Sequence, residues 1–284
     1  VGYYSLQTSN KGSKLEIAAD YFTSQSLSNT DYLFNATAAR QSESQTSDGV
    51  HFRSDYLHVF NRSHRLSAGY DFFRSKVDDD FDFYAESNRF IYREMVNSVY
   101  ASWRAQWSDA FSTSAGLRME NTHSDGHLTD TGERTKRNYT DLFPNISLSL
   151  DLPRGNQSIS LDIERYTSRA QFYRLNPFAR WTSNNTYTKG NPYLNPSHDW
   201  FVMLYYSFLR DFTFYIQHIR HDRSMMEYTY SDNDGNTISS VSNNGKSRYW
   251  GCRIQYNRTF WRIYDIRVET GGSKDSRQSL VNGD

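Results

Sequence analysis

The side chains of this 284-residue chain that could do chemistry are mainly carboxylates and guanidinium groups at alternate positions. Arg118 and Glu120 are two residues apart, and so are Asp162 and Glu164, which Arg165 follows. In an extended strand, residues two apart lie on the same face, so each pair would share one side of a sheet. Such charges either neutralise each other on a wet surface or contact a solute, and the spacing is compatible with both. We select Arg118 and Glu120 as candidate ligand contacts.

Catalytic signatures are missing from the sequence. It contains no GxSxG nucleophile elbow, no HExxH, no Walker loop and no Rossmann fingerprint. Asp162 and Glu164 have a separation that suits glycosidase chemistry, but nothing indicates the apolar pocket that would make one of them a proton donor. We therefore predict that the protein is not an enzyme and has neither catalytic residues nor a cofactor.

Two clusters have the residue types of a metal site but not its spacing. The acidic run at residues 78–82 lacks the glycine and the final glutamate of an EF-hand, so a solvated loop is the simpler interpretation. His218 and His221 are three residues apart and face opposite sides of a strand, which prevents them from holding one metal ion together. No metal site is predicted.

Aromatic residues stand out in the polar stretch 170–197. Trp181, Tyr187 and Tyr193 are candidate ligand-binding residues, because such rings stack on sugars or cap hydrophobic ligands, although they also pack on one another. The same stretch contains Leu175-Asn176-Pro177 and Gly190-Asn191-Pro192. Glycine, asparagine and proline fix turn geometry, so we interpret these two motifs as structural.

The elements that would position these residues are strands with two different faces. Ile146, Leu148 and Leu150 alternate with Asn145, Ser147 and Ser149, and the same period of two recurs along the chain. It is clearest in the stretches 15–21, 66–72, 99–107, 111–119, 159–163 and 250–256. No segment has a convincing helical period. The pattern predicts an all-β fold.

Turn signals divide the chain into about twelve strands of about ten residues or more. Short turns are predicted at Asn10–Ser13, Asn61–His64, Ser108–Asp109, Pro153–Gln157, Arg210–Asp211 and Asn257–Thr259. Long polar loops are predicted at 24–48, 77–90, 122–137, 170–197 and 231–246. Short and long connections alternate, which indicates an up-and-down antiparallel meander.

The composition combines a low mean hydropathy of −0.82 with 22 Tyr, 18 Phe and 6 Trp. The many rings argue against disorder. The formal net charge is zero and no basic run occurs, so a nucleic-acid partner is not expected. Cys252 is the single cysteine and cannot form an intramolecular disulfide. No stretch has the roughly 18 to 20 apolar residues of a membrane helix, and the chain does not start with a signal peptide.

Long two-faced strands with short turns at one end and long loops at the other are typical of an outer-membrane β-barrel. Lipid cannot satisfy backbone N–H and C=O groups, so a membrane sheet closes on itself, and its lumen can stay polar. Aromatic residues near strand ends, such as Tyr205, Phe212 and Trp250, would form girdles at the headgroups. The alternative is a soluble sandwich or propeller that binds carbohydrate or mediates adhesion.

Four motifs between Gly116 and Pro196 sharpen the barrel hypothesis. They are Ala115–Thr122 (AGLRMENT), Leu142-Phe143-Pro144, Arg165–Arg169 followed by Leu175–Phe178 (LNPF), and Gly190–Pro196 (GNPYLNP). In this order they resemble the barrel region of TonB-dependent outer-membrane receptors, in the outer-membrane β-barrel branch. One departure is Ala170, where the family often has proline after the arginine.

This resemblance implies an antiparallel up-and-down transmembrane β-barrel of about 22 strands, to which residues 1–284 would contribute a fragment of about twelve. The plug domain and the remaining strands are not visible in the sequence, and the last residues, 281–284, lack the terminal aromatic that such barrels usually have. The implied partners are outer-membrane lipid, the receptor's own plug, an inner-membrane TonB-type energy-coupling complex and a surface lipoprotein.

The implied function is capture of a nutrient, such as a siderophore, glycan or peptide, at extracellular loops, followed by passage to the periplasm. The Arg118 and Glu120 charges would then face the plug or the passing solute. A passive, porin-like barrel is the further alternative if the complete receptor has no plug.

Overall fold

A computed structural model of the protein describes residues 2–8, 12–34, 37–83, 86–152, 156–209 and 211–279. Its long strands are β1 (Gly2–Gln7), β2 (Lys14–Phe34), β3 (Thr37–Val59), β4 (His64–Phe83), β5 (Glu86–Gln106), β6 (Phe111–Leu128), β7 (Arg134–Leu152), β8 (Gln157–Ser168), β11 (Ser197–Phe208), β12 (Phe212–Ser231), β13 (Thr237–Phe260) and β14 (Tyr264–Ser279). The short α1 (Phe172–Leu175), β9 (Ala179–Ser183) and β10 (Thr186–Lys189) lie between β8 and β11.

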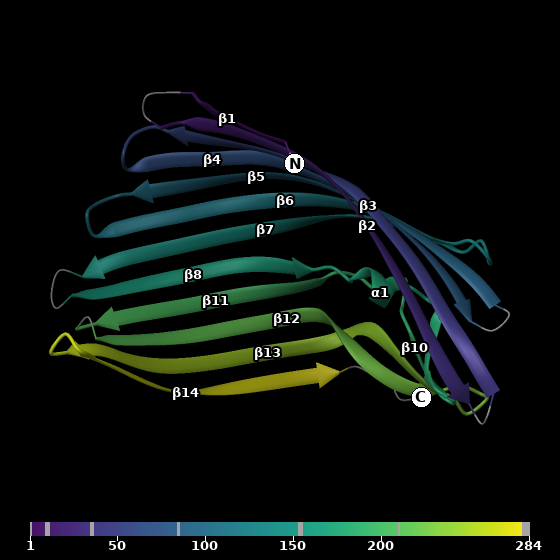
Figure 1. The fold of residues 1–284 in the computed structure, drawn as a ribbon. Helices are drawn as coiled ribbons and strands as arrows, with labels where there is room; N and C mark the ends of the chain where they lie inside the picture. Colours follow the sequence, from purple (N-terminus) through teal and green to yellow (C-terminus); the bar gives the residue numbers. More distant parts are fainter. Residues whose placement is uncertain are drawn as a thin grey trace.

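The long strands form one curved sheet in which each pairs antiparallel with its neighbours along the chain, β8 pairing directly with β11 (Figure 1). The predicted all-β meander of about twelve strands is therefore confirmed within the described residues. β1 and β14 lie at the two edges of the meander and do not pair with each other there. Closure into a complete barrel stays a prediction.

Short turns gather at one end of the sheet, at the left of Figure 1. At residues 60–63 the Asn61 side chain accepts hydrogen bonds from the backbone N–H groups of Ser63 and His64, and Ser108 accepts from Ala110 and Phe111 in the same way. These turns confirm the predictions at Asn61–His64 and Ser108–Asp109. The turns predicted at Asn10–Ser13, Pro153–Gln157 and Arg210–Asp211 lie partly outside the described residues.

Four of the five predicted long loops are wrong. The stretches 24–48, 77–90, 122–137 and 231–246 are mostly strand, so β2 has 21 residues and β13 has 24. These extensions carry polar side chains on both faces, so they lack the apolar–polar alternation that marks a strand, although they keep its backbone hydrogen bonds. The last turn also lies at residues 261–263 and not at Asn257–Thr259, since Arg258 and Thr259 still pair with β14.

The two faces of the sheet have opposite chemistry along the half nearest the short turns. On β7, the outer face presents Leu142, Ile146 and Leu150, which are 47%, 41% and 38% exposed. The inner face carries polar contacts instead, such as the 2.5 Å hydrogen bond from the Ser147 hydroxyl to the Asp162 carboxylate. Exposed apolar side chains of this kind recur on β5, β6, β13 and β14. They would be costly in water, and hydrocarbon removes that cost.

Aromatic rings border the apolar outer face at the short turns. Phe60 and Trp103 lie with ring centroids 5.2 Å apart, and His64 contacts Trp107, which is 60% exposed. Such rings suit the headgroup level, where one edge is apolar and the other wet. Within the described residues, no helix has the length and apolar character needed to cross a membrane.

Candidate functional site

We call the curved sheet the wall. Residues 169–196, which we name the strap, leave the wall after β8 and return to it at β11. The strap crosses the polar face at the end opposite the short turns, where α1 and β10 lie in Figure 1. There β10 pairs with β9 and, in parallel, with residues 237–239 of β13. The strap thus joins parts of the wall that are far apart in the sheet.

Two motifs fold the strap back on itself. The backbone N–H of Gly190 donates to the carbonyl of Asn176 at 3.0 Å, and the N–H of Asn191 donates to the carbonyl of Arg174 at 2.6 Å. A Cβ atom at position 190 would overlap both carbonyl oxygens, so glycine is required for this close approach. The structural interpretation of the two Asn-Pro motifs is supported.

Asn176 anchors the strap to β4. The side chain is fully buried, its amide donates to the buried carboxylate of Asp79, and its carbonyl oxygen accepts from the N–H of Phe178 at 3.1 Å. The Phe178 ring stacks on Phe81 with centroids 5.4 Å apart and also meets Phe90. A buried polar pair surrounded by rings fixes the strap in one position, because an unpaired amide or carboxylate there would be costly.

Arg180 adds charge to this anchor. Its guanidinium pairs with Glu43 of β3 and lies 3.2 Å from a carboxylate oxygen of Asp79. Burial raises the pKa of Asp79 above its usual range, and the nearby charge of Glu43 raises it further, whereas Arg180 opposes the shift. Glu43 and Asp79 thus share one cation, which favours keeping a proton on Asp79.

Arg118 and Glu120, the candidate contacts on β6, lie together on the polar face as predicted. Their side chains form an ion pair of 2.5 Å, and Arg118 also donates to the Ser98 hydroxyl at 2.8 Å. Arg169 of the strap pairs with the other oxygen of Glu120, which is only 8% exposed. Glu120 therefore fixes Arg169, the first residue of the strap, to β6. Ligand contact by Arg118 or Glu120 stays a prediction.

The three aromatic candidates separate into two groups. Trp181 and Tyr187 contact each other with centroids 4.8 Å apart, and Trp181 also stacks on Phe83 of β4. Tyr193 lies elsewhere on the strap, where its hydroxyl donates to Glu133 at 2.5 Å and its side chain is 60% exposed. Packing explains Trp181 and Tyr187, while Tyr193 offers an open ring to solvent. Their role in ligand binding stays a prediction.

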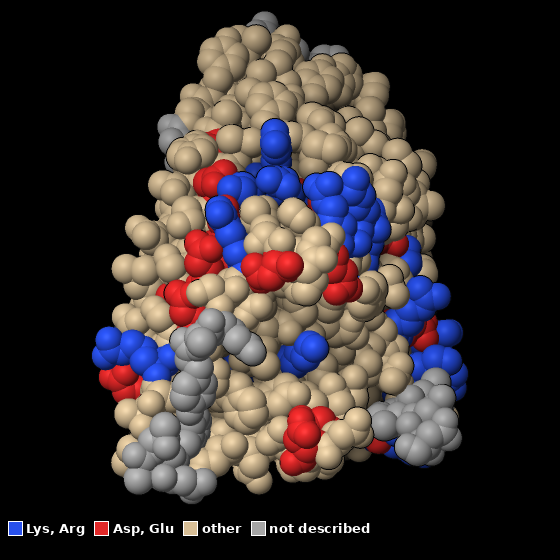
Figure 2. Space-filling model, turned by 90° about the vertical axis from the view of Figure 1, so that its right-hand side faces the viewer, with Lys and Arg blue, Asp and Glu red and all other residues tan. Residues whose placement is uncertain are grey.

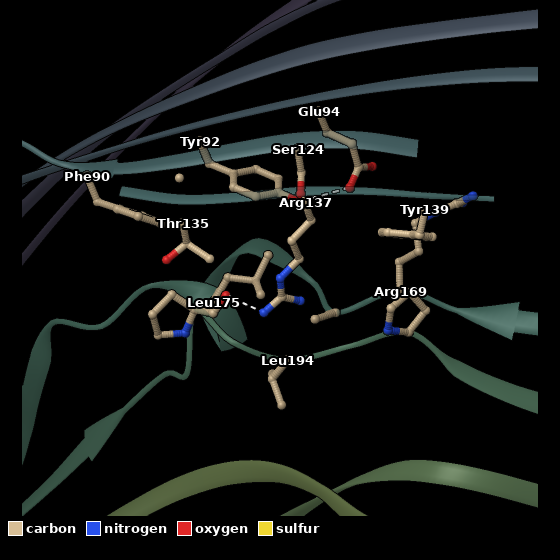
Figure 3. Close-up of a pocket in the computed structure, with 14 residues that line it drawn as sticks. Phe90, Tyr92, Glu94, Ser124, Thr135, Arg137, Tyr139, Arg169, Leu175 and Leu194 are labelled. Carbon is tan, nitrogen blue, oxygen red and sulfur yellow. Dashed lines mark hydrogen bonds between the residues drawn. The ribbon is translucent and has the colours of Figure 1, made fainter. Parts of the chain in front are cut away.

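A small cavity lies between the strap and the wall (Figure 3). Arg137 of β7 reaches into it and donates to the carbonyl of Pro192 at 2.7 Å, and Tyr92 donates to Glu94 at 2.8 Å. Burial lowers the pKa of Arg137, although nearby tyrosines oppose the shift. The cavity volume, about 20 Å³, has room for about one water molecule and is too small for a nutrient. The cavity is a packing feature of the strap.

The acidic run and the histidines do not assemble a metal site. Asp78 pairs with Lys76 at 2.8 Å and with Arg89 at 2.7 Å. His218 stacks on Trp250, whereas His221 pairs with Asp199. Within the residues that the structure describes, no group of three His, Cys, Asp or Glu side chains is arranged to hold a metal ion.

Sequence reasoning missed the anchoring roles of Asp79, Arg137, Arg169 and Arg180. In the sequence, Asp79 is one of four aspartates in the acidic run 78–82, and nothing local distinguishes it from the others. Its pairing with Asn176 spans 97 positions, which no local pattern indicates. The signal available was the LNPF motif, whose asparagine turns out to be the buried anchor.

The comparisons with known proteins agree with this architecture. A model of the outer membrane protein beta-barrel family matches residues 6–283. The chain belongs to this family. The outer-membrane β-barrel branch to which the four motifs pointed is thereby confirmed, and so is localisation in the outer membrane. No curated protein matches the chain by sequence.

Solved structures of transport and uptake proteins share the fold at low identity. The ferric citrate transporter FecA is 12% identical with a TM-score of 0.61, over 99% of this chain and 42% of that one. The copper transporter OprC is 8% identical with a TM-score of 0.65, over 92% and 44%. The ferric yersiniabactin uptake receptor FyuA from Yersinia pestis is 13% identical with a TM-score of 0.55, over 93% and 40%. The chain spans less than half the length of these proteins.

The first prediction concerns the buried amide. In the complete receptor, Asn176→Ala removes the amide donor of the Asp79 carboxylate and the acceptor of the Phe178 N–H, and should lower the free energy of strap opening by about 2 to 4 kcal/mol. Hydrogen exchange of residues 171–182 measures this change as faster exchange. Asn185→Ala, at an exposed position between β9 and β10, is the matched control and should leave the rate unchanged. Equal exchange in both variants would contradict the anchor.

The second prediction concerns pH. Because the folded pKa of Asp79 lies above that of an unfolded chain, about 3.9, the folded strap binds more protons and its attachment weakens as the pH rises from about 4 toward neutrality. Strap exchange, corrected for intrinsic rates, should therefore be faster at pH 8 than at pH 5. Asp79→Asn should abolish the difference and Asp80→Asn, on the opposite face, should keep it. A wild-type strap with no pH dependence would refute the account of Asp79.

Proposed function

We propose that this chain is part of the wall of a TonB-dependent outer-membrane receptor, which captures a nutrient at its extracellular end and passes it to the periplasm. The observation that best supports this proposal is the strap, which is fixed across the polar face at the end of the sheet opposite the short turns. Outer-membrane barrels place their longer connections outside the cell, so the strap would lie at the extracellular end.

The strap suits a binding platform better than a mobile lid. Its anchors reach β3, β4, β6, β7 and β13, so ordering the strap costs nothing when a ligand arrives. Seen from the end of the sheet opposite the short turns, Lys and Arg side chains gather in one part of the surface with Asp and Glu beside them (Figure 2). Aromatic and charged groups together favour ligands that combine an apolar or ring-shaped part with polar groups.

The solved structures support the same function class without naming the ligand. FecA is a ferric citrate transporter, OprC a copper transporter and FyuA a ferric yersiniabactin uptake receptor, and RagAB, 10% identical with a TM-score of 0.51, is a peptide transporter. For this receptor we keep siderophores, metal complexes, glycans and peptides as ligand classes. Binding and transport, not catalysis, are the proposed activity.

A plug domain of the same receptor is the proposed partner of the polar face near the short turns. There Arg62, Arg65 and Arg104 are exposed on the inner side of the wall. A plug with carboxylates would complement them, and an inner-membrane TonB-type complex would move it. A surface lipoprotein remains a proposed partner at the outer end. A passive barrel would need neither plug nor coupling complex.

The third prediction tests transport and its ligand contacts. A strain that lacks the complete receptor should lose uptake of one nutrient class from a panel of ferric siderophores, glycans and peptides. Tyr193→Ala should raise the nutrient concentration for half-maximal uptake about fivefold, because a lost ring contact costs roughly 1 kcal/mol. Tyr264→Ala, exposed at the short-turn end, is the control and should leave it unchanged.

A proton uncoupler separates the receptor from a passive barrel. Uptake by an energised receptor should stop when the uncoupler is added, while surface binding of the same nutrient persists. Uptake that continues at an undiminished rate would favour the passive, porin-like alternative.

A further inference from the structure

The outer face of β4–β7 changes character in an ordered way along the strands. Cross-strand pairing places Tyr70, Val99, Met119 and Leu142 in one row, which is the last fully apolar row of the outer face. One row further from the short turns, Phe72 lies beside asparagine and threonine side chains. The hydrocarbon boundary on these strands therefore lies near Phe72.

Cations follow directly beyond this boundary. The next outward row contains Arg74 and His123, and the row after it contains Lys76, Arg93 and Lys136. Arg74 lies two positions beyond Phe72, which is about 7 Å along a strand. Long Lys and Arg side chains can cover that distance back toward the membrane surface.

Several of these cations have no acidic partner. Lys76 pairs with Asp78, and the carboxylate of Asp125 between Arg93 and Lys136 pairs with Arg134 at 3.2 Å. Arg74, Arg93 and Lys136 are exposed, and among the described residues none of the three is in an ion pair. Asp48, opposite Lys76 on β3, is the other carboxylate of these two rows. The rows together retain a positive charge.

We propose that Arg74, Arg93 and Lys136 form a binding site for the phosphorylated headgroup of a lipid in the outer leaflet. The apolar rows below would hold the acyl chains, and the two guanidinium groups suit bidentate contact with phosphate. Lipid is the occupant because the cations continue directly from the membrane-facing surface, on the side of the wall away from the strap. This site is independent of the transported nutrient.

The test uses the complete receptor in nanodiscs, with a lipid that carries a diphosphorylated sugar headgroup and the same lipid without phosphate. Native mass spectrometry after detergent extraction counts the retained lipid molecules. Wild type should retain the phosphorylated lipid in preference. The triple variant Arg74→Gln, Arg93→Gln, Lys136→Gln should bind it roughly 100-fold more weakly, since each cation near a membrane surface contributes roughly a fivefold change in affinity.

A matched triple variant controls for loss of charge. Arg62→Gln, Arg65→Gln and Arg104→Gln remove three exposed cations from the inner side of the wall at the short-turn end, and should retain the lipid as wild type does. Equal retention by the outer triple variant, equal loss in the control, or no preference for the phosphorylated lipid would each overturn the proposal. So would binding of inorganic phosphate with the same affinity as the lipid, because that would define a soluble-anion site.

Discussion

The backbone hydrogen bonds of the wall are the constraint on which this structure depends. In hydrocarbon an unpaired N–H or C=O costs several kcal/mol, so each strand must be paired along its membrane-spanning length. Once the ladder meets that requirement, the side chains are free to differ between the two faces. The outer face of β7 presents Leu142, Ile146 and Leu150 to lipid, while its inner face bonds Ser147 to Asp162. The low mean hydropathy of the chain follows from this arrangement.

Beyond the membrane the same ladder supports a different kind of order. The strands continue into water, and the strap folds across their polar face. It is held by a few buried polar contacts, above all Asn176 with Asp79 and Arg169 with Glu120. Buried charges stabilise little in net terms, but leaving one unpaired is costly, so they specify one position for the strap. A fixed strap with the exposed ring of Tyr193 is the physical basis of the proposed receptor function.

The alternation of side chains made the wall predictable. Ile146 and Leu148 alternate with serines because one face meets lipid, and that period predicted the strands and their number. It could not give the extensions at 24–48 and 77–90, since water on both sides removes the alternation. Nor could it pair Asn176 with Asp79, which lie 97 positions apart. Arg118 and Glu120 were placed on one face correctly. The ion pair between Arg169 and Glu120 could not be predicted, because it depends on the path of the strap.

The central claim is that each membrane strand separates lipid from water. Spin labels on β6 of the complete receptor in lipid vesicles test it directly, through collisions with oxygen, which concentrates in the bilayer, and with a water-soluble nickel complex. Labels at Thr113, Ala115 and Leu117 should respond to oxygen, and labels at Ser112 and Ser114 to nickel. A uniform response along the strand, or the reverse alternation, would contradict the account.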